Sequence, residues 1–296
     1  MLKPPQVREP GFGSAALPAT CGELVQGLLD GVPCLVSCPI DRYSTATVKL
    51  QPEPGWEVPP DAPKAVAALR AGLAYLGEPP GGGWLQLTSD LPRGRGYGSS
   101  TADVGATLYA LGQGLGRPLA APEVKRMAVA VEPSDSTIFP GLVLFDHRSG
   151  SFHKSLGPVP SLAVIVLDPG GEVDTLAYNR EVRPESLRRF TAEHREAFAL
   201  LEAGLTEDNW ALVGKAATLS ARTHQAVLFN PLLDATLDAC RALGGLGVCR
   251  AHSGTILGLL LDPARTPPHE LLRRAQAMMP QCVEIHLRRL VDGGPR

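Results

Sequence analysis

Apolar residues recur along the chain at two spacings, which predict a mixture of helices and strands. In residues 64–76, for example, Leu69, Leu73 and Leu76 fall on one side of a helix. Helices are predicted over residues 64–76, 101–115, 123–132, 184–205, 207–224, 230–243 and 268–279. Alternating or short continuous apolar runs predict strands over residues 35–40, 44–50, 84–88, 141–146, 162–167, 255–261 and 283–287. Strands and helices do not alternate regularly, and this favours an α+β fold over a doubly wound parallel sheet.

The ends of these elements are marked by proline and glycine. Residues 1–16, rich in both, are expected to form an irregular leader, and five prolines predict a loop over residues 51–63. A further Gly-Pro-Val-Pro sequence at residues 157–160 predicts the boundary between two domains, 1–158 and 159–296. A chain of 296 residues is long enough to bury a large core without disulfide or metal cross-links.

Charge and hydropathy exclude several classes of protein. The 28 basic and 30 acidic residues give a net charge of −2, so a general nucleic-acid binder is not expected. The longest apolar run, residues 256–261, is far shorter than the ~20 residues that cross a bilayer. No apolar segment typical of a signal peptide opens the sequence, so a cytoplasmic protein without membrane partners is expected. The six cysteines have no zinc-finger spacing and are expected to be buried structural thiols.

The segment 92–100 carries the strongest chemical signal. Gly94, Gly96 and Gly98 permit positive φ angles and a close approach of the backbone to a ligand. Ser99 and Ser100 then begin a helix, whose free N–H groups and dipole attract an anion. Strand, glycine loop and helix together predict a phosphate-binding site. It is not a Walker loop, because no lysine follows the last glycine, and its G-x-G-x-G spacing differs from the dinucleotide fingerprint G-x-G-x-x-G.

Three motifs resemble those of the GHMP small-molecule kinases. Residues 92–102 resemble P-x-x-x-G-L-G-S-S-A-A, with Tyr97 in place of Leu and Thr101 in place of the first Ala. Residues 18–24, Pro-Ala-Thr-Cys-Gly-Glu-Leu, resemble the first motif of this family, and residues 251–255, Ala-His-Ser-Gly-Thr, resemble the third. The stretches 21–27, 35–41, 132–137 and 251–255 are similar to the branch of the family that phosphorylates free L-threonine in cobalamin biosynthesis.

This resemblance implies a two-domain fold, ATP and Mg²⁺. The N-terminal domain would be a ribosomal-protein-like α/β domain that binds ATP, and the C-terminal domain would be ferredoxin-like. The implied activity is phosphorylation of the side-chain hydroxyl of L-threonine to give L-threonine O-phosphate. Homoserine differs from threonine only in the placement of a methylene, a difference worth ~1–3 kcal/mol of binding energy in a pocket. The motifs therefore do not exclude a homoserine kinase. The alternative outside the enzymes is a non-catalytic member of the family that binds a ligand without phosphorylating it.

The resemblance also implies roles for particular residues. Ser100 would ligate magnesium with Glu132, while Glu123 is a rival for the metal. Asp135 would accept the proton of the substrate hydroxyl or orient that hydroxyl. The residues expected to bind the nucleotide phosphates are Pro92, Arg93, Gly94, Arg95, Gly96, Tyr97, Gly98, Ser99, Ser100 and Thr101.

Three further residues are expected to bind the acceptor. The α-ammonium group of an amino acid calls for a carboxylate, and Glu23 is expected to supply it from a loop that lines a cleft. His252 and Ser253, in the third motif, are expected at the border of the acceptor or phosphate pocket.

Overall fold

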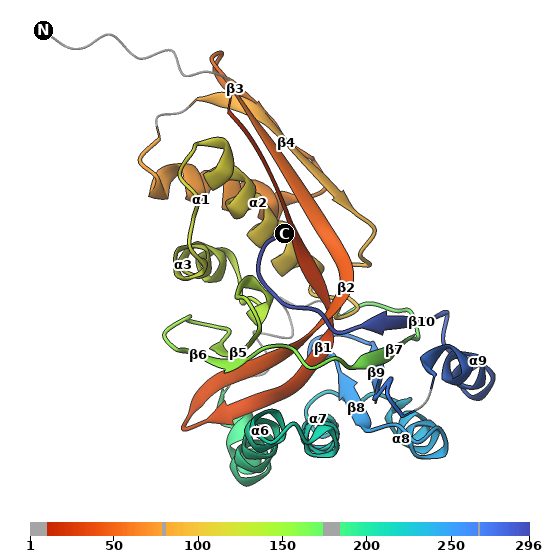
Figure 1. The fold of residues 1–296 in the computed structure, drawn as a ribbon. Coiled ribbons are helices and arrows are strands. Elements are labelled where there is room, and N and C mark those ends of the chain that lie inside the picture. The colour runs from red at the N-terminus through yellow and green to blue at the C-terminus, as the bar shows by residue number, and fades with distance from the viewer. Residues whose placement is uncertain (1–10, 79–80, 174–183, 266) are drawn as a thin grey trace, which may run out of the picture.

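The computed structural model describes residues 11–78, 81–173, 184–265 and 267–296, and its strands join into one large sheet (Figure 1). The strands are β1 (Phe12–Leu29), β2 (Val32–Gln51), β3 (Gly55–Glu57), β4 (Gly82–Ser89), β5 (Leu142–Asp146), β6 (His153–Gly157), β7 (Ala163–Asp168), β8 (Gly247–Arg250), β9 (Leu257–Leu261) and β10 (Glu284–Arg289). Their order in the sheet is β10-β7-β9-β8-β1-β2-β4-β3, with β5 paired to β2 and β6 to β5. A single sheet therefore runs through both halves of the molecule.

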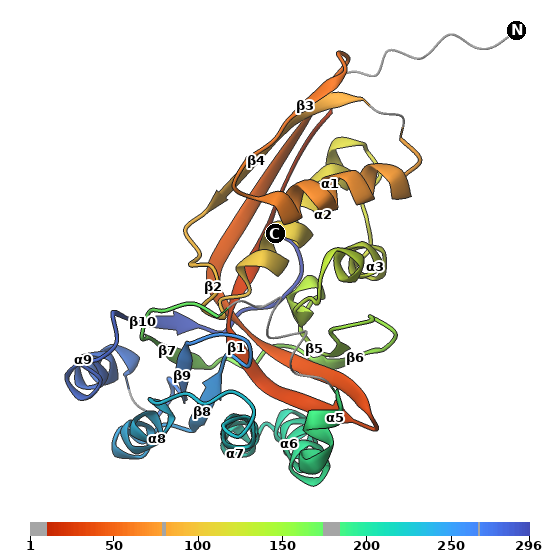
Figure 2. The ribbon, with the colours of Figure 1, turned by 180° about the vertical axis from the view of Figure 1, so that it is seen from behind.

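The helices lie in two groups beside this sheet. They are α1 (Pro63–Tyr75), α2 (Ser99–Gly114), α3 (Ala121–Val131), α5 (Pro184–Leu187), α6 (Thr191–Thr206), α7 (Trp210–His224), α8 (Leu233–Ala242) and α9 (Pro268–Met278), with the short 3₁₀ helices η1 (Ser136–Ile138) and η2 (Arg188–Phe190). Helices α1, α2 and α3 lie together beside the β1–β2 ribbon, and the later helices lie at the other end of the molecule (Figure 2). Helix α2 packs directly on β1 and β2, which places its N-terminus beside the middle of the sheet.

The C-terminal half has the ferredoxin-like arrangement. Its elements follow the order strand, helices, strand, strand, helix, strand, from β7 to β10. Within this half the strand order is β10-β7-β9-β8, and each neighbouring pair is antiparallel. Strand β8 then joins the half to β1. The α+β fold class expected from the sequence is confirmed, and so is the ferredoxin-like C-terminal half.

Strand β1 was not among the strands expected from the sequence, and two expectations for its residues were wrong. Residues 12–16, expected in an irregular leader, belong to β1, while residues 1–10 of that leader lie outside the described part of the chain. Glu23, expected in a loop, lies within β1, where the pairing register with β2 shifts on both sides of it. Gly22 takes a φ of 59° there, and Glu23 also pairs with Arg250 of β8. The bulge around Glu23 breaks the alternation of apolar residues in β1, so the sequence pattern does not indicate a strand there.

Other strands and helices depart from the sequence pattern more modestly. The two strands expected over residues 35–40 and 44–50 are one continuous strand, β2. Strands β6 and β8 were not expected, since β6 is mostly exposed and polar and β8 follows a glycine-rich turn. The loop expected over residues 51–63 contains the short strand β3. The helix expected over residues 184–205 is divided into α5, η2 and α6.

The hydrophobic core also spans the two halves. One cluster of buried residues includes Leu17 of β1, Leu108 of α2 and Leu201 of α6. A second cluster, with Ile165 of β7 and Leu259 of β9, fills the space between the C-terminal strands and helices α8 and α9. Burial of this apolar surface fixes the position of α2 relative to the end of β8, and these two segments border the candidate site.

Candidate active site

The glycine loop, residues 91–98, connects β4 to α2 and adopts a conformation that depends on its glycines. Gly94, Gly96 and Gly98 have φ angles of 69°, 98° and 65°. Gly98 is the N-cap of α2, and no side chain satisfies the N–H groups of the first turn by capping. These N–H groups and the positive end of the helix dipole are therefore available to an anion.

The glycine loop is held by hydrogen bonds from segments distant in the sequence. The backbone N–H of Thr20 donates to the carbonyl of Tyr97 (2.8 Å), and the Thr20 hydroxyl donates to the carbonyl of Gly96 (3.1 Å). From the third motif, the N–H groups of Thr255 and Ile256 donate to the carbonyl of Arg95, at 2.9 and 3.0 Å. The first and third motifs thus support the second from opposite halves of the chain.

A cleft opens along the glycine loop and the first turn of α2. Its other walls come from the start of α1, from residues 132–135 after α3, and from Glu23 and Gln26 of β1. Ser253 of the third motif also lines it. The cleft therefore joins the predicted phosphate-binding loop to the residues predicted to bind metal and acceptor.

Ser100, Glu132 and Lys64 form a polar cluster in this cleft. The Ser100 hydroxyl donates a hydrogen bond to Oε1 of Glu132, whose side chain is buried. The Nζ atom of Lys64 lies 2.5 Å from Oε2 of the same carboxylate. A hydroxyl and a carboxylate side by side are hard oxygen ligands of the kind that Mg²⁺ prefers.

Asp135 lies directly over the N-terminus of α2. A Cβ atom added to Gly98 would be only 2.8 Å from Oδ2 of Asp135, so the close approach requires glycine. The backbone N–H of Asp135 donates to the hydroxyl of Thr101 (3.0 Å), which fixes the residue against the helix. Burial, reinforced by the nearby charge of Glu23, raises the pKa of Asp135 to about 7.

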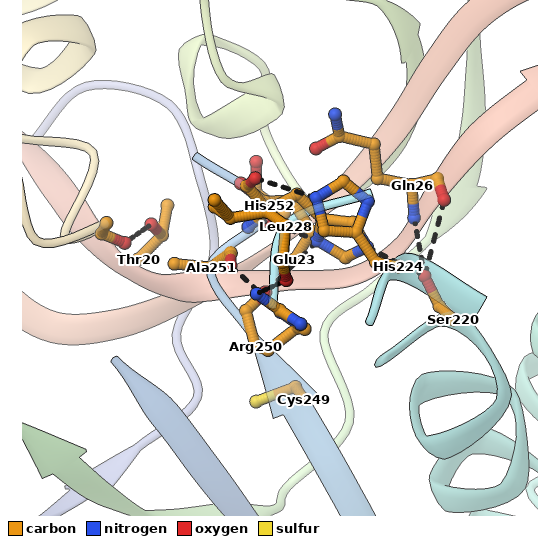
Figure 3. Close-up of polar contacts among 12 residues, drawn as sticks. Thr20, Glu23, Gln26, Ser220, His224, Leu228, Cys249, Arg250, Ala251 and His252 are labelled. Carbon is orange, nitrogen blue, oxygen red and sulfur yellow. Dashed lines mark hydrogen bonds and ion pairs between the residues drawn. The ribbon is translucent and has the colours of Figure 1, made fainter. Parts of the chain in front are cut away.

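Glu23 and His252 form a buried pair beneath the cleft (Figure 3). Oε2 of Glu23 accepts hydrogen bonds from the backbone N–H of His252 (2.9 Å) and lies 2.8 Å from its Nδ1. Nε2 of His252 is 3.0 Å from the hydroxyl of Ser220. Burial lowers the pKa of His252 and raises that of Glu23 to about 8. The imidazole is therefore neutral at pH 7, and its Nδ1–H can donate to Glu23.

The structure separates the expected site residues into two groups. Glu23, Ser100, Glu132, Asp135 and Ser253 all line the cleft, as do Arg93, Gly94, Thr101 and the segment 96–99. Pro92, Arg95 and His252 do not line it. His252 is fully buried behind Glu23, and the Arg95 side chain pairs with Asp168.

Glu123, the rival to Glu132, lies at the start of α3 and does not line the cleft. Its carboxylate accepts the backbone N–H of Ala120 (2.8 Å) and the phenol of Tyr75 (3.0 Å). The side chain therefore caps a helix, and Glu132 alone of the two carboxylates adjoins Ser100.

Three titratable residues of the cleft were missed in the sequence. Lys64 is the second residue of α1, Asp103 lies in the first turns of α2, and His147 follows β5; all three line the cleft. The Asp103 carboxylate accepts the hydroxyl of Ser44 at 2.5 Å, and burial raises its pKa. Burial lowers the pKa of His147 to about 4. Of the three, only Asp103 had a signal in the sequence, since it is an acidic residue among apolar ones just after the glycine motif. An aspartate in such a place is rarely buried without a partner.

Comparison with known proteins places the chain in a family. Residues 63–139 match the GHMP kinases N terminal domain, and residues 199–281 match the GHMP kinases C terminal model. The L-threonine kinase of Salmonella typhimurium is 33% identical over 290 residues, which cover 95% of this chain and 94% of that protein. The L-threonine kinase of Citrobacter freundii is 33% identical over 282 residues, covering 95% and 98%.

Solved structures agree with this placement. Homoserine kinase from Cytophaga hutchinsonii superposes with a TM-score of 0.77 at 20% identity, covering 100% of this chain and 99% of that one. Mevalonate kinase of L. major gives a TM-score of 0.69 at 16% identity, covering 99% and 100%. The chain belongs to the GHMP kinase family, and the resemblance seen in its motifs is confirmed. Within that family it is a small-molecule kinase of the threonine and homoserine type.

Two other expectations concern cysteines and membranes. All six cysteines lie in described segments and are free thiols, and only Cys282 is partly exposed. Among the described helices, none is long and apolar enough to cross a membrane.

Gly96→Ala should destabilise the protein more than Gly116→Ala. A Cβ on Gly96 would lie 2.1 Å from that of Ala251, whereas Gly116, also at positive φ, has no described atom within 4 Å of such a Cβ. Left-handed backbone strain costs about 1–2 kcal/mol at either site. Steric overlap at Gly96 should add about 1–3 kcal/mol. Urea denaturation measures the free energy of unfolding of both variants. Equal losses of stability would contradict the close packing of the glycine loop on the third motif.

Proposed function

We propose that this kinase transfers the γ-phosphoryl group of ATP to the side-chain hydroxyl of free L-threonine, as a step in cobalamin biosynthesis. The hydroxyl oxygen forms the new bond to phosphorus, the bond to the bridging oxygen of ADP breaks, and the hydroxyl proton leaves. The products are L-threonine O-phosphate and ADP. The observation that carries this proposal is the position of Asp135, whose carboxylate lies against Gly98 at the anion-binding end of α2.

The choice of threonine is supported by the extent of the similarity. The two L-threonine kinases match 95% of this chain, whereas the homoserine kinase of Halalkalibacterium halodurans matches only 44% of it, at 36% identity. A second homoserine kinase, from Bacillus velezensis, matches 67% at 26% identity. Homoserine is therefore the second candidate acceptor.

The glycine loop and the start of α2 would hold the triphosphate through backbone N–H groups. Lys64, at the mouth of the same cleft, places a positive charge within reach of the phosphates. Ser100 and Glu132 fit Mg²⁺, since their oxygens already lie within hydrogen-bonding distance. One carboxylate, a hydroxyl and phosphate oxygens form a typical magnesium environment. When bound there, the ion would offset the negative charge of the triphosphate.

Asp135 would receive the proton of the threonine hydroxyl. Its raised pKa makes the carboxylate a better proton acceptor than an exposed aspartate, and it is deprotonated above pH 7. Glu23, on the adjacent wall, would bind the α-ammonium group of the substrate. Oε2 of Glu23 is oriented by His252, so the carboxylate is held in place before the substrate arrives.

The activity is tested by incubating the protein with ATP and Mg²⁺ and one of L-threonine, L-serine or L-homoserine, and by identifying the phosphorylated amino acid. We expect L-threonine to give the highest kcat/KM. A product formed only from L-homoserine would overturn the choice of substrate, and no phosphorylation of any of the three would overturn the amino-acid acceptor.

Asp135→Asn should lower kcat by about 100-fold or more, the usual size of general-base catalysis. Because the pKa of Asp135 is raised to about 7, kcat of the unaltered enzyme should fall as the pH drops through 7 and the carboxylate is protonated. That limb of the pH profile should be absent in the variant. A loss of only a few-fold with an unchanged profile would show that Asp135 does not accept the proton.

Above pH 8, where the Glu23 carboxylate is ionised, Glu23→Gln should raise the KM for L-threonine at least tenfold and leave the KM for ATP unchanged. Glutamine retains an oxygen for the N–H groups of His252 but loses the charge opposite the substrate ammonium. A tenfold change corresponds to about 1.4 kcal/mol, modest for a charge-assisted hydrogen bond. Glu123→Gln, which removes a charge outside the cleft, is the matched control. A lower melting temperature with an unaltered KM for threonine would make Glu23 purely structural.

A further inference from the structure

One buried carboxylate outside the cleft is bound to two side chains of the glycine loop. Asp168, the last residue of β7, is completely buried. Its Oδ2 accepts a hydrogen bond from the phenol of Tyr97 (3.1 Å) and one from Nη1 of Arg95 (3.2 Å). Its Oδ1 accepts the backbone N–H of Gly170 (2.8 Å). A carboxylate with no exposure is costly unless such donors surround it, so this arrangement is closely specified.

The segment after β7 contacts the glycine loop at a second point. The backbone N–H of Val173 donates to the carbonyl of Gly94 at 2.8 Å. Asp168 and Val173, from the C-terminal half, therefore hold residues 94–97 in addition to Thr20 of β1. The cleft does not include Asp168, which is why the catalytic roles above leave it unused.

Tyr97 is placed by its ring as well as by its hydroxyl. Its side chain is buried, and the guanidinium carbon of Arg42 lies 5.3 Å from the ring centroid. Arg42 is itself paired with Asp90 at 3.1 Å, immediately before the glycine loop. Tyr97 stands where the motif that this loop resembles has leucine, so the hydroxyl that meets Asp168 is not part of that motif.

Arg95 is directed away from the cleft by the same carboxylate. A loop arginine next to bound phosphates would ordinarily be assigned to them, but its Nη1 is bound to Asp168 and its side chain is only 27% exposed. Both polar side chains of the segment 95–97 thus act on the protein itself. Their shared partner keeps the loop in one position although its three glycines have positive φ angles.

We propose that Asp168 is a positioning residue, which accepts hydrogen bonds from Tyr97 and Arg95 and so fixes the phosphate-binding loop before the nucleotide arrives. This inference rests on the proposed use of the loop for ATP. Preorganisation lowers the cost of binding, so loss of this contact weakens ATP binding. It leaves Asp135 and the acceptor site in place, so the phosphoryl transfer step at saturating ATP is unaffected.

The decisive variant is Tyr97→Phe, which removes one hydrogen bond and keeps the ring. We expect Kd for a non-hydrolysable ATP analogue with Mg²⁺, measured by calorimetry, to rise about five- to tenfold, the effect of one buried hydrogen bond. The KM for ATP should rise by a similar factor, while kcat at saturating ATP and the KM for L-threonine stay within twofold. Tyr109→Phe is the matched control, since its buried phenol donates to the carbonyl of Ile138 (3.0 Å) away from the loop.

The outcomes distinguish this inference from the proposed function. An unchanged Kd for Tyr97→Phe, or an equal rise in Tyr109→Phe, would overturn the positioning role while leaving the kinase activity intact. Failure of the unaltered protein to bind the analogue would overturn the proposed use of ATP, and this inference with it. Asp168→Asn should weaken binding at least as much as Tyr97→Phe. If it does not fold, Tyr97→Phe still decides the question.

Discussion

The structure depends on the conformation of the glycine loop between β4 and α2. Gly94, Gly96 and Gly98 take positive φ angles, which opens the N-terminus of α2 to an anion. Glycines that permit this conformation also permit many others, so the loop has to be held from outside. It is held by Thr20 of β1, by the backbone at residues 255–256 and by Asp168 of β7. These three supports come from both halves of the chain. The continuous sheet holds the two halves together, so the conformation of the glycine loop depends on it.

The same packing determines the chemistry of the cleft. Glu23, Glu132 and Asp135 are brought together with little exposure, in contact with the first turn of α2 or with the end of β8. Burial raises the pKa of Glu23 to about 8, and burial together with the nearby charge of Glu23 raises the pKa of Asp135 to about 7. A carboxylate whose pKa lies near 7 is suited to accept a proton at neutral pH, the role proposed for Asp135. Lys64 and Ser100 hold Glu132 in place.

The sequence predicted most of the helices and the glycine loop before α2 well, since both are local. Residues 64–76 have a clear helical period, and the glycines, serines and helix start of the loop are contiguous. It failed for several strands: β8 is short, and β1 was not expected as a strand because a bulge around Glu23 interrupts its pattern. Nothing in the sequence indicated the roles of Lys64 and Asp168, because each forms its hydrogen bond with a residue about 70 positions away in the chain. The domain boundary at residues 158 and 159 and the roles of the site residues stay predictions.

The most direct test is a crystal structure of the protein with a non-hydrolysable ATP analogue, Mg²⁺ and L-threonine. The account predicts that the phosphate oxygens accept hydrogen bonds from backbone N–H groups of residues 96–100. It also predicts that the threonine hydroxyl lies between the γ-phosphate and Asp135, with its ammonium group on Glu23. A nucleotide bound away from the N-terminus of α2, or an amino acid whose hydroxyl points away from Asp135, would contradict it.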